Sequence, residues 1–267
     1  MANGFPLENC TVIITGASSG LGAEFARQLA PLAQSLILVA RRAEALEEVK
    51  KSLEGQKATV SCCVADLATD AGRAVVPAFL EAHGVKPNLL INNAGMGDYG
   101  SFSSSSTDRT RSQIELNITA LTMLSHALLP MLGKPGGILN VSSLAGTLPM
   151  PDLAVYAASK AYVTSLSEAL AVELAPLGIT VTCVCPGPTP TNFGKNAKRP
   201  DGTDTNRDGQ GLLRIPPSQV VAEALQALRR GRPCIYPGVG VSIASRIFRH
   251  LPRRLMRVML RRRHGGD

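Results

Sequence analysis

Short apolar runs alternate along this chain with longer segments of helical periodicity. The apolar runs predict strands at 11–15, 35–40, 58–65, 88–92, 138–142, 178–185 and 233–236. Near-continuous apolar character over so short a length is typical of parallel strands that are buried on both faces. The segments between them predict helices, among them 69–83, 109–132, 155–175 and 218–230. This alternation predicts an α/β domain with a parallel sheet.

The helix predicted at 109–132 is apolar on more than one side. Its apolar residues are Ile114, Ile118, Leu121, Leu128 and Leu132 on one stripe, extended by Leu116, Met123, Leu124 and Leu129. We expect such a helix to be covered twice, by the sheet and by another subunit. Asn117 lies in its middle, where a buried amide needs hydrogen-bond partners. It is either a structural bridge to the backbone or part of a site.

A glycine-rich turn, TGASSGLG at 15–22, follows the first strand and leads into a helix. This order predicts a dinucleotide site, because glycine lets the backbone approach a pyrophosphate whose charge the helix N-terminus offsets. The spacing is G-x-x-x-G-x-G rather than G-x-G-x-x-G. The expected cofactor contacts are Gly16, Ser18, Ser19, Gly20, Leu21 and Gly22.

The second predicted strand ends at Ala40, a point where NAD enzymes carry an acid that accepts from the ribose hydroxyls. Here Arg41 and Arg42 follow instead. Two guanidinium groups can bind a 2′-phosphate, so the pair favours NADP(H) over NAD(H). The alternative is that one arginine is only solvated at the start of a helix.

Polar residues end the next two strands. Asp66, followed by Leu67, either accepts from an adenine amino group or caps the next helix. The segment NNAG at 92–95 ends the fourth strand, and its side-chain amides can tie neighbouring loops together. We expect Asn93, Ala94 and Gly95 to lie close to the cofactor.

Ser143, Tyr156 and Lys160 are the candidate catalytic group. Tyr156 and Lys160 are four residues apart, so they share one face of a helix. An ammonium beside a phenol should lower the pKa of the tyrosine, which then exchanges protons near neutral pH. Ser143 follows the fifth predicted strand and can hold a carbonyl oxygen together with Tyr156. The Tyr-x-x-x-Lys pattern alone arises by chance in many helices, so its interpretation rests on the neighbouring motifs.

Composition narrows the function classes. The chain has no tryptophan and only 4% aromatic residues, which argues against stacking platforms for single-stranded nucleic acid. We see no apolar run of membrane-spanning length and no signal peptide, and expect a reducing cytoplasm. The six cysteines form no C-x-x-C pair and do not group with histidines, so zinc and disulfides are not expected. Cys183 and Cys185 are predicted to be buried core thiols.

The positive charge is concentrated at the C-terminus. Residues 246–267 hold eight arginines and one acid, so the rest of the chain is nearly neutral and no nucleic-acid partner is expected. One helical face carries Ile247, Leu251, Leu255, Val258 and Met259, and the opposite one Arg246, Arg249, Arg253 and Arg257. Pro252 marks a break or a helix start. The segment is either a membrane-surface helix or a helix docked on its own body or a sister subunit.

These motifs resemble, in order and spacing, the short-chain dehydrogenase/reductase family over roughly residues 7–238. The matching features are TGASSGLG, Asp66-Leu67, NNAG, Asn117, Ser143, YAASK and the turn PG-x-T-x-T. The resemblance implies a Rossmann-type doubly wound parallel sheet of about seven strands in three α/β/α layers. It also implies one catalytic domain at 1–238, followed by a basic amphipathic extension at 239–267.

The resemblance implies a role for each matched residue. Tyr156 is the general acid in reduction and the base in oxidation, and Ser143 polarises the substrate carbonyl. Lys160 lowers the pKa of the tyrosine and binds the nicotinamide ribose, and Asn117 holds a water that relays protons. In the turn formed by Pro186, Gly187, Thr189 and Thr191, the last threonine contacts the nicotinamide carboxamide. Family members pack as homodimers or homotetramers through the helices around Asn117 and Tyr156.

The expected function is therefore an NADPH-dependent interconversion of a carbonyl and a secondary alcohol, without a metal. A 3-oxoacyl reductase and a hydroxysteroid-type dehydrogenase remain alternatives, as do a non-catalytic nucleotide sensor and a membrane-associated scaffold. We expect the polar segment that follows the turn at 186–191, up to about residue 217, to form a flap over the substrate. An apolar set, Met96, Leu144, Met150, Leu153 and Phe193, is expected to line the pocket.

Overall fold

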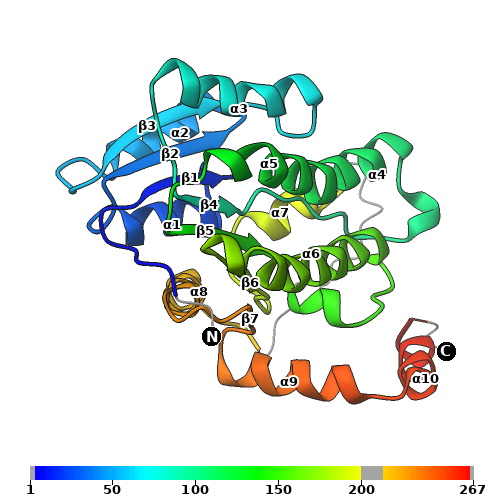
Figure 1. Cartoon of the computed structure of the whole chain (residues 1–267). Helices are drawn as coiled ribbons and strands as arrows, with labels where there is room; N and C mark the ends of the chain where they lie inside the picture. Colours follow the sequence, from blue (N-terminus) through cyan, green and yellow to red (C-terminus); the bar gives the residue numbers. More distant parts are fainter. Residues whose placement is uncertain (1–3, 200–212, 265–267) are drawn as a thin grey trace.

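The computed structural model describes residues 4–199 and 213–264, which surround one seven-stranded parallel sheet (Figure 1). Its strands are β1 (Thr11–Thr15), β2 (Ser35–Ala40), β3 (Thr59–Val64), β4 (Leu89–Asn92), β5 (Gly136–Val141), β6 (Ile179–Val184) and β7 (Cys234–Ile235). Their order is β3-β2-β1-β4-β5-β6-β7. The chain therefore reverses direction across the sheet between β1 and β4, the point at which such sheets bind ligands. The predicted Rossmann-type sheet is confirmed.

Helices cover both faces of the sheet and make three layers (Figure 1). One face carries α1 (Gly20–Leu29), α2 (Ala43–Lys51) and α8 (Pro217–Arg229), and the other α3 (Asp70–Ala82), α5 (Leu121–Leu128) and α6 (Ala154–Glu173). Strand β1 shows why the strands are apolar throughout: Val12 and Ile14 enter one core, and Ile13 enters the other. Strand β1 supplies both cores, so neither of its faces is polar.

Two predicted helix starts are wrong in detail. The helix predicted at 218–230 begins one residue earlier, at Pro217, with Pro216 as its N-cap residue. Proline suits the first helical position, where the missing N–H would have no partner. Likewise, Asp66 does not cap α3, since the hydroxyl of Thr69 accepts from the backbone N–H of Gly72.

The helix predicted as continuous over 109–132 is instead interrupted. It consists of α4 (Thr107–Ile114), a π-helical segment (Glu115–Ala120) and α5, followed by a 3₁₀ turn at Leu129–Met131. Asn117 lies in the π segment, a feature frequent at functional sites. Leu121, Leu128 and Leu132 of the predicted stripe are buried as expected, whereas Ile114 of the same stripe is 41% exposed and Met123 is 53% exposed.

The C-terminal extension forms two helices beyond the β7 edge of the sheet, not one helix with a single apolar face (Figure 1). Helix α9 (Val239–His250) ends before Pro252, and α10 (Arg253–His264) follows it, so the predicted break at this proline is confirmed. Helix α9 packs on the body through Val241 and Ser245, which are buried. Among the described residues, none of the helices combines the length and apolar character that crossing a bilayer requires.

Candidate active site

The glycine-rich turn is built for close backbone approach. Gly16 has a φ of 65°, and a Cβ on it would lie 2.9 Å from Cα of Ala94. A Cβ on Gly22 would lie 2.2 Å from the carbonyl oxygen of Gly16, so α1 meets the turn at a distance that only glycine permits. The side chain of Ser19, the N-cap residue of α1, makes no capping bond, and no acid lies in the first turn. These features fit a bound pyrophosphate, whose charge an acid at this helix end would repel.

The segment NNAG holds the turn in place, as predicted. The amide of Asn93 donates to the carbonyl oxygens of Thr15, at 2.9 Å, and Gly16, at 3.2 Å. The hydroxyl of Thr15 accepts in return from the backbone N–H groups of Asn93 and Ala94, at 2.9 and 3.0 Å. Four hydrogen bonds thus fix the ends of β1 and β4 against each other. They rigidify the crossing point of the sheet where a cofactor would lie.

The residues predicted to meet the adenosine end are largely exposed. Arg41 and Arg42 stand on the surface after β2, and Nη1 of Arg41 lies 4.0 Å from a carboxylate oxygen of Asp66. The other oxygen of Asp66 accepts from the backbone N–H of Ala68, at 3.1 Å. Leu67 is buried in the core beneath the loop. The structure therefore brings Arg41 and Asp66 together, while Arg42 serves as the N-cap residue of α2 without a side-chain bond.

Tyr156 lies in the first turn of α6, beside Ser143. Ser143 follows β5 and caps a 3₁₀ turn (Leu144–Thr147), where its Oγ accepts from the backbone N–H of Ala145 at 3.1 Å. Burial raises the pKa of the Tyr156 phenol, a hydrogen bond with the Ser143 side chain lowers it in part, and the result is about 12. The expected lowering of this pKa is thus wrong for this structure. The cost of desolvating a phenolate outweighs the favourable contacts.

The position of Lys160 explains why its expected lowering of the Tyr156 pKa is weak. Its Nζ lies 5.8 Å from the centroid of the Tyr156 ring and donates to the carbonyl oxygen of Val141 at 2.8 Å. Its side chain is 4% exposed, and burial lowers its pKa to about 8. The ammonium group of Lys160 therefore lies over the Tyr156 ring and is held by its hydrogen bond to the end of β5.

Asn117 and Gly95 complete the group on the side of β4. The side chain of Asn117 accepts from the backbone N–H of Met96 and donates to its carbonyl oxygen, both at 2.9 Å, and donates to Oγ of Ser159 at 3.1 Å. A Cβ on Gly95 would lie 3.3 Å from Oδ1 of Asn117 and 3.4 Å from Nζ of Lys160. Asn117 is therefore a bridge between the β4 loop and α6, and it lies next to the predicted lysine.

The turn after β6 contacts both the 3₁₀ turn that Ser143 caps and the glycine-rich turn. The carbonyl oxygen of Pro186 accepts from the backbone N–H of Leu144, and Thr189 donates to Gly187. Thr191 lies against the cofactor turn, because a Cβ on Gly20 would be 3.3 Å from its Cβ. A Cβ on Gly187 would lie 2.7 Å from Cγ2 of Val241, so α9 packs directly beneath this turn.

Sequence reasoning missed a buried ion-pair network beside the site. Asp98, in the loop after β4, accepts from both Arg109 and Arg199, with bidentate bonds of 2.9 and 2.8 Å to the latter. Burial raises the pKa of Asp98, but the hydrogen bonds from Arg199, Ser105 and Arg109 outweigh it and bring the pKa to about 2. Arg109 and Arg199 are 11 and 101 positions away from Asp98 in the sequence, and no local pattern relates the three residues.

This network joins the β4 loop to the segment after β6. That segment includes α7 (Phe193–Ala197), where the Phe193 ring lies 5.4 Å from the Tyr156 ring. Phe193 therefore lies beside Tyr156 of the candidate catalytic group, which agrees with its predicted place in the pocket. Residues 200–212 of the predicted flap lie outside the described residues.

The comparisons with known proteins agree with this geometry. Residues 10–202 match the family model described as short chain dehydrogenase. The sulfoacetaldehyde reductase of Chromohalobacter salexigens is 38% identical over 187 residues, which are 68% of this chain and 73% of that protein.

Two solved structures share the whole architecture. One is a short-chain dehydrogenase from Sphingobium yanoikuyae in complex with NADPH, with a TM-score of 0.78, 32% identity, and coverage of 93% of this chain and 95% of that one. The other is a short chain dehydrogenase/reductase from Burkholderia phymatum in complex with NAD, with a TM-score of 0.77, 26% identity, and coverage of 91% and 94%. The chain therefore belongs to the short-chain dehydrogenase/reductase family and is a nicotinamide-dependent oxidoreductase.

Proposed function

We propose that this protein is an NADPH-dependent reductase that interconverts a carbonyl and a secondary alcohol, with Tyr156 as the proton donor. The observation that carries the proposal is the placement of Ser143 and Tyr156 beside each other at the strand ends, with Lys160 behind the ring. Two hydroxyl groups so placed can both donate to one carbonyl oxygen, which stabilises the negative charge that develops there.

The residues that would hold the cofactor are those of the glycine-rich turn, the segment 93–95 and Thr191, which line one edge of the sheet. When bound, the nicotinamide supplies the hydride. The protein supplies the proton: with its pKa raised to about 12, the Tyr156 phenol stays protonated at neutral pH and is ready to donate. The Ser143 hydroxyl orients the carbonyl oxygen. In the reverse direction Tyr156 accepts the proton of the alcohol, a step that the charge of Lys160 favours.

A matched pair of variants tests the reaction. Tyr156→Phe removes the acidic proton but keeps the ring, so turnover should fall by about 10²–10⁴-fold while NADPH still binds. Ser143→Ala should reduce turnover less, because Tyr156 remains. The measurements are NADPH oxidation over a carbonyl panel and NADPH binding by fluorescence. Tight NADPH binding with no turnover of any carbonyl by the parent protein would favour a nucleotide sensor instead.

The preference for NADPH rests on the end of β2. No acid stands there, and the exposed guanidinium of Arg41 is free to rotate away from its distant partner Asp66. The resemblance to the NADPH complex from S. yanoikuyae supports this, whereas the NAD complex from B. phymatum shows that the fold accepts either cofactor. Arg41→Ala should raise KM for NADPH and leave KM for NADH unchanged. A preference of the parent protein for NADH would refute the proposal.

The substrate class follows from the pocket and the relatives. Met96, Leu144 and Phe193 stand near the catalytic group and favour a partly apolar carbonyl. The similarity to a sulfoacetaldehyde reductase adds a small anionic aldehyde as an alternative candidate, whose reduction would give a primary rather than a secondary alcohol. The panel should therefore compare sulfoacetaldehyde, 3-oxoacyl thioesters, hydroxysteroid ketones and aromatic ketones, ranked by kcat/KM.

A second proposed function concerns the C-terminal extension, which we propose to contact anionic membranes from a cytoplasmic location. Val239, Ile243 and Ile247 lie along one face of α9 and are 80%, 53% and 56% exposed. Leu255 and Val258 of α10 are also exposed, among arginines. Exposed apolar residues flanked by positive charge are typical of surface-binding helices.

Vesicle sedimentation tests the membrane proposal. The full chain should sediment with phosphatidylserine-containing vesicles more than with phosphatidylcholine alone, and Ile243→Glu/Ile247→Glu should abolish the difference. Val75→Glu, which alters an exposed apolar residue on α3, is the matched control and should bind as the parent does. Equal sedimentation of the parent and the double variant would refute membrane contact through α9.

A further inference from the structure

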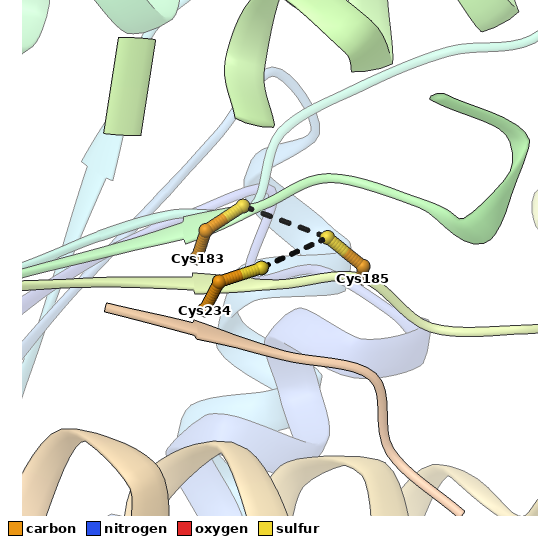
Figure 2. Close-up of side chains that lie close together, drawn as sticks. All are labelled: Cys183, Cys185 and Cys234. Carbon is orange, nitrogen blue, oxygen red and sulfur yellow. Dashed lines mark hydrogen bonds between the residues drawn. The ribbon is translucent and has the colours of Figure 1, made fainter. Parts of the chain in front are cut away.

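Three cysteine side chains gather on and just beyond the last two strands (Figure 2). Cys183 lies on β6 in register with Cys234 on β7, and Cys185 follows two residues later on the same face. Residues two apart in an extended strand point the same way. Sequence reasoning placed Cys183 and Cys185 together but missed Cys234, because only the pairing of β7 with β6 brings it to them.

The sulfur atoms are already spaced as metal ligands. Sγ of Cys185 lies 3.7 Å from Sγ of Cys183 and 3.9 Å from Sγ of Cys234, and all three lie within 4.8 Å of one another. Thiolates bound to zinc at about 2.3 Å stand about 3.8 Å apart in a tetrahedral site and about 4.0 Å in a trigonal one. Little movement is therefore needed to close three Sγ atoms around one ion.

We propose that Cys183, Cys185 and Cys234 bind a single thiophilic d¹⁰ metal ion, Zn²⁺ or Cu⁺. Within the described part of the chain, this group holds no histidine or carboxylate. Ligands that are all thiolates select soft ions over Mg²⁺, Ca²⁺ and Mn²⁺. The earlier expectation that zinc is absent rested on the lack of a C-x-x-C motif, which this cross-strand arrangement does not need.

The surroundings suit such an ion. Oγ1 of Thr164, on α6, lies 3.7 Å from Sγ of Cys185 and 4.0 Å from Sγ of Cys183, so a hydroxyl stands beside the thiols as a neighbour or a fourth ligand. Cys183 and Cys185 are buried, whereas Cys234 is only partly so. Cys234 therefore marks the side from which an ion would enter.

Positive side chains can balance the bound thiolates. Arg249 of α9 donates to the Tyr236 hydroxyl at 3.1 Å, lies over its ring, and is close enough to interact electrostatically with Cys234. Lys160 interacts in the same way with Cys183 and Cys185. Three thiolates carry one excess negative charge with Zn²⁺ and two with Cu⁺. Arg249 is also paired with Glu168 at 3.3 Å, so Arg249, Lys160 and Glu168 together offset one of these charges.

Cadmium reports directly on this geometry. The reduced, metal-free, full-length protein is titrated with Cd²⁺, and the thiolate-to-metal charge-transfer absorbance is followed in the ultraviolet. We expect saturation at one equivalent with the intensity of three thiolates. Cys234→Ser should lower the intensity and weaken binding at least tenfold, whereas Cys63→Ser on β3, a buried cysteine outside the group, should leave both unchanged. Absence of the band, or an identical band in Cys234→Ser, overturns the proposal.

Two further measurements use the parent protein, so they test the site even if Cys234→Ser folds poorly. They also identify the bound ion. Native mass spectrometry of the parent protein should show one metal ion per chain, and elemental analysis should identify that ion as Zn²⁺ or Cu⁺. Alkylation followed by peptide mapping should show that added Zn²⁺ protects Cys234 and leaves Cys62 as reactive as before. Equal labelling of Cys234 with and without metal, or a disulfide between Cys185 and Cys234 in place of bound metal, contradicts the site.

Discussion

At the scale of single residues, Tyr156 holds the proton of the site and Lys160 holds its positive charge. Tyr156 keeps its proton because burial disfavours the phenolate, and Lys160 lies behind the ring with its Nζ bound to Val141. Burial also lowers the pKa of Lys160 to about 8, so its charge is lost in mildly basic solution. The pair therefore responds to pH through the lysine before the tyrosine.

The reduction rate should consequently fall as pH rises through about 8, because the neutral amine no longer stabilises the phenolate formed when Tyr156 gives up its proton. Lys160→Met should be slow and should lack this inflection, since its side chain cannot titrate. The measurement is kcat for reduction at saturating NADPH across the pH range. A parent profile that is flat from neutral to strongly basic pH would contradict this assignment.

At the scale of elements, the loop after β4 is tied to the segment after β6 by one buried carboxylate. Asp98 and Arg199 have side chains 7% and 3% exposed, and Arg199 also donates to Ser104 and Ser101. Breaking a buried pair by removing one partner costs about 3–5 kcal/mol, because the remaining charge is left without compensation. The network thus fixes α7, and with it Phe193, beside Tyr156.

Asp98→Asn should therefore lower the free energy of unfolding by an amount of that order and raise KM for substrate. The control variant, Arg111→Ala at an exposed position, should do neither.

The folded pKa of Asp98, about 2, lies below the usual value of about 3.9. Its stabilising contribution is therefore complete above about pH 4 and lost as pH falls through about 2. Denaturant unfolding of both variants at several pH values checks this. Equal stability of Asp98→Asn and the parent at neutral pH would show that the network is not stabilising.

Elements with a local signal were predictable, and those made by distant partners were not. The strands and the turn at 15–22 follow from apolar runs and glycines, so their prediction needed no tertiary information. The π segment around Asn117, the network around Asp98 and the placement of Cys234 each depend on residues far away in the sequence. The prediction of a lowered pKa for Tyr156 was wrong for the same reason. The spacing placed Lys160 on the correct helix face but could not indicate that both groups are buried.

At the scale of the whole molecule, one lateral surface is left apolar. Met123 on α5 and Val172 on α6 are 53% and 76% exposed, and Ile114 on α4 and Tyr162 on α6 are also exposed. The sheet side of these helices is buried in the core, so the second cover expected from the sequence is not supplied by the described part of the chain. Apolar residues that gather on one face of neighbouring helices are typical of a subunit interface.

We therefore predict that the protein is a homodimer or homotetramer packed through α4, α5 and α6. Met123→Glu/Val172→Glu places like charges opposite each other across a two-fold interface and should shift the mass in solution toward the monomer, because an isologous contact repeats each substitution. Val239→Glu changes an equally exposed apolar residue on α9 and should leave the mass unchanged. Light scattering after size exclusion gives the mass of each variant. If Val239→Glu dissociates the assembly and the double variant does not, the subunits pack through the C-terminal extension instead.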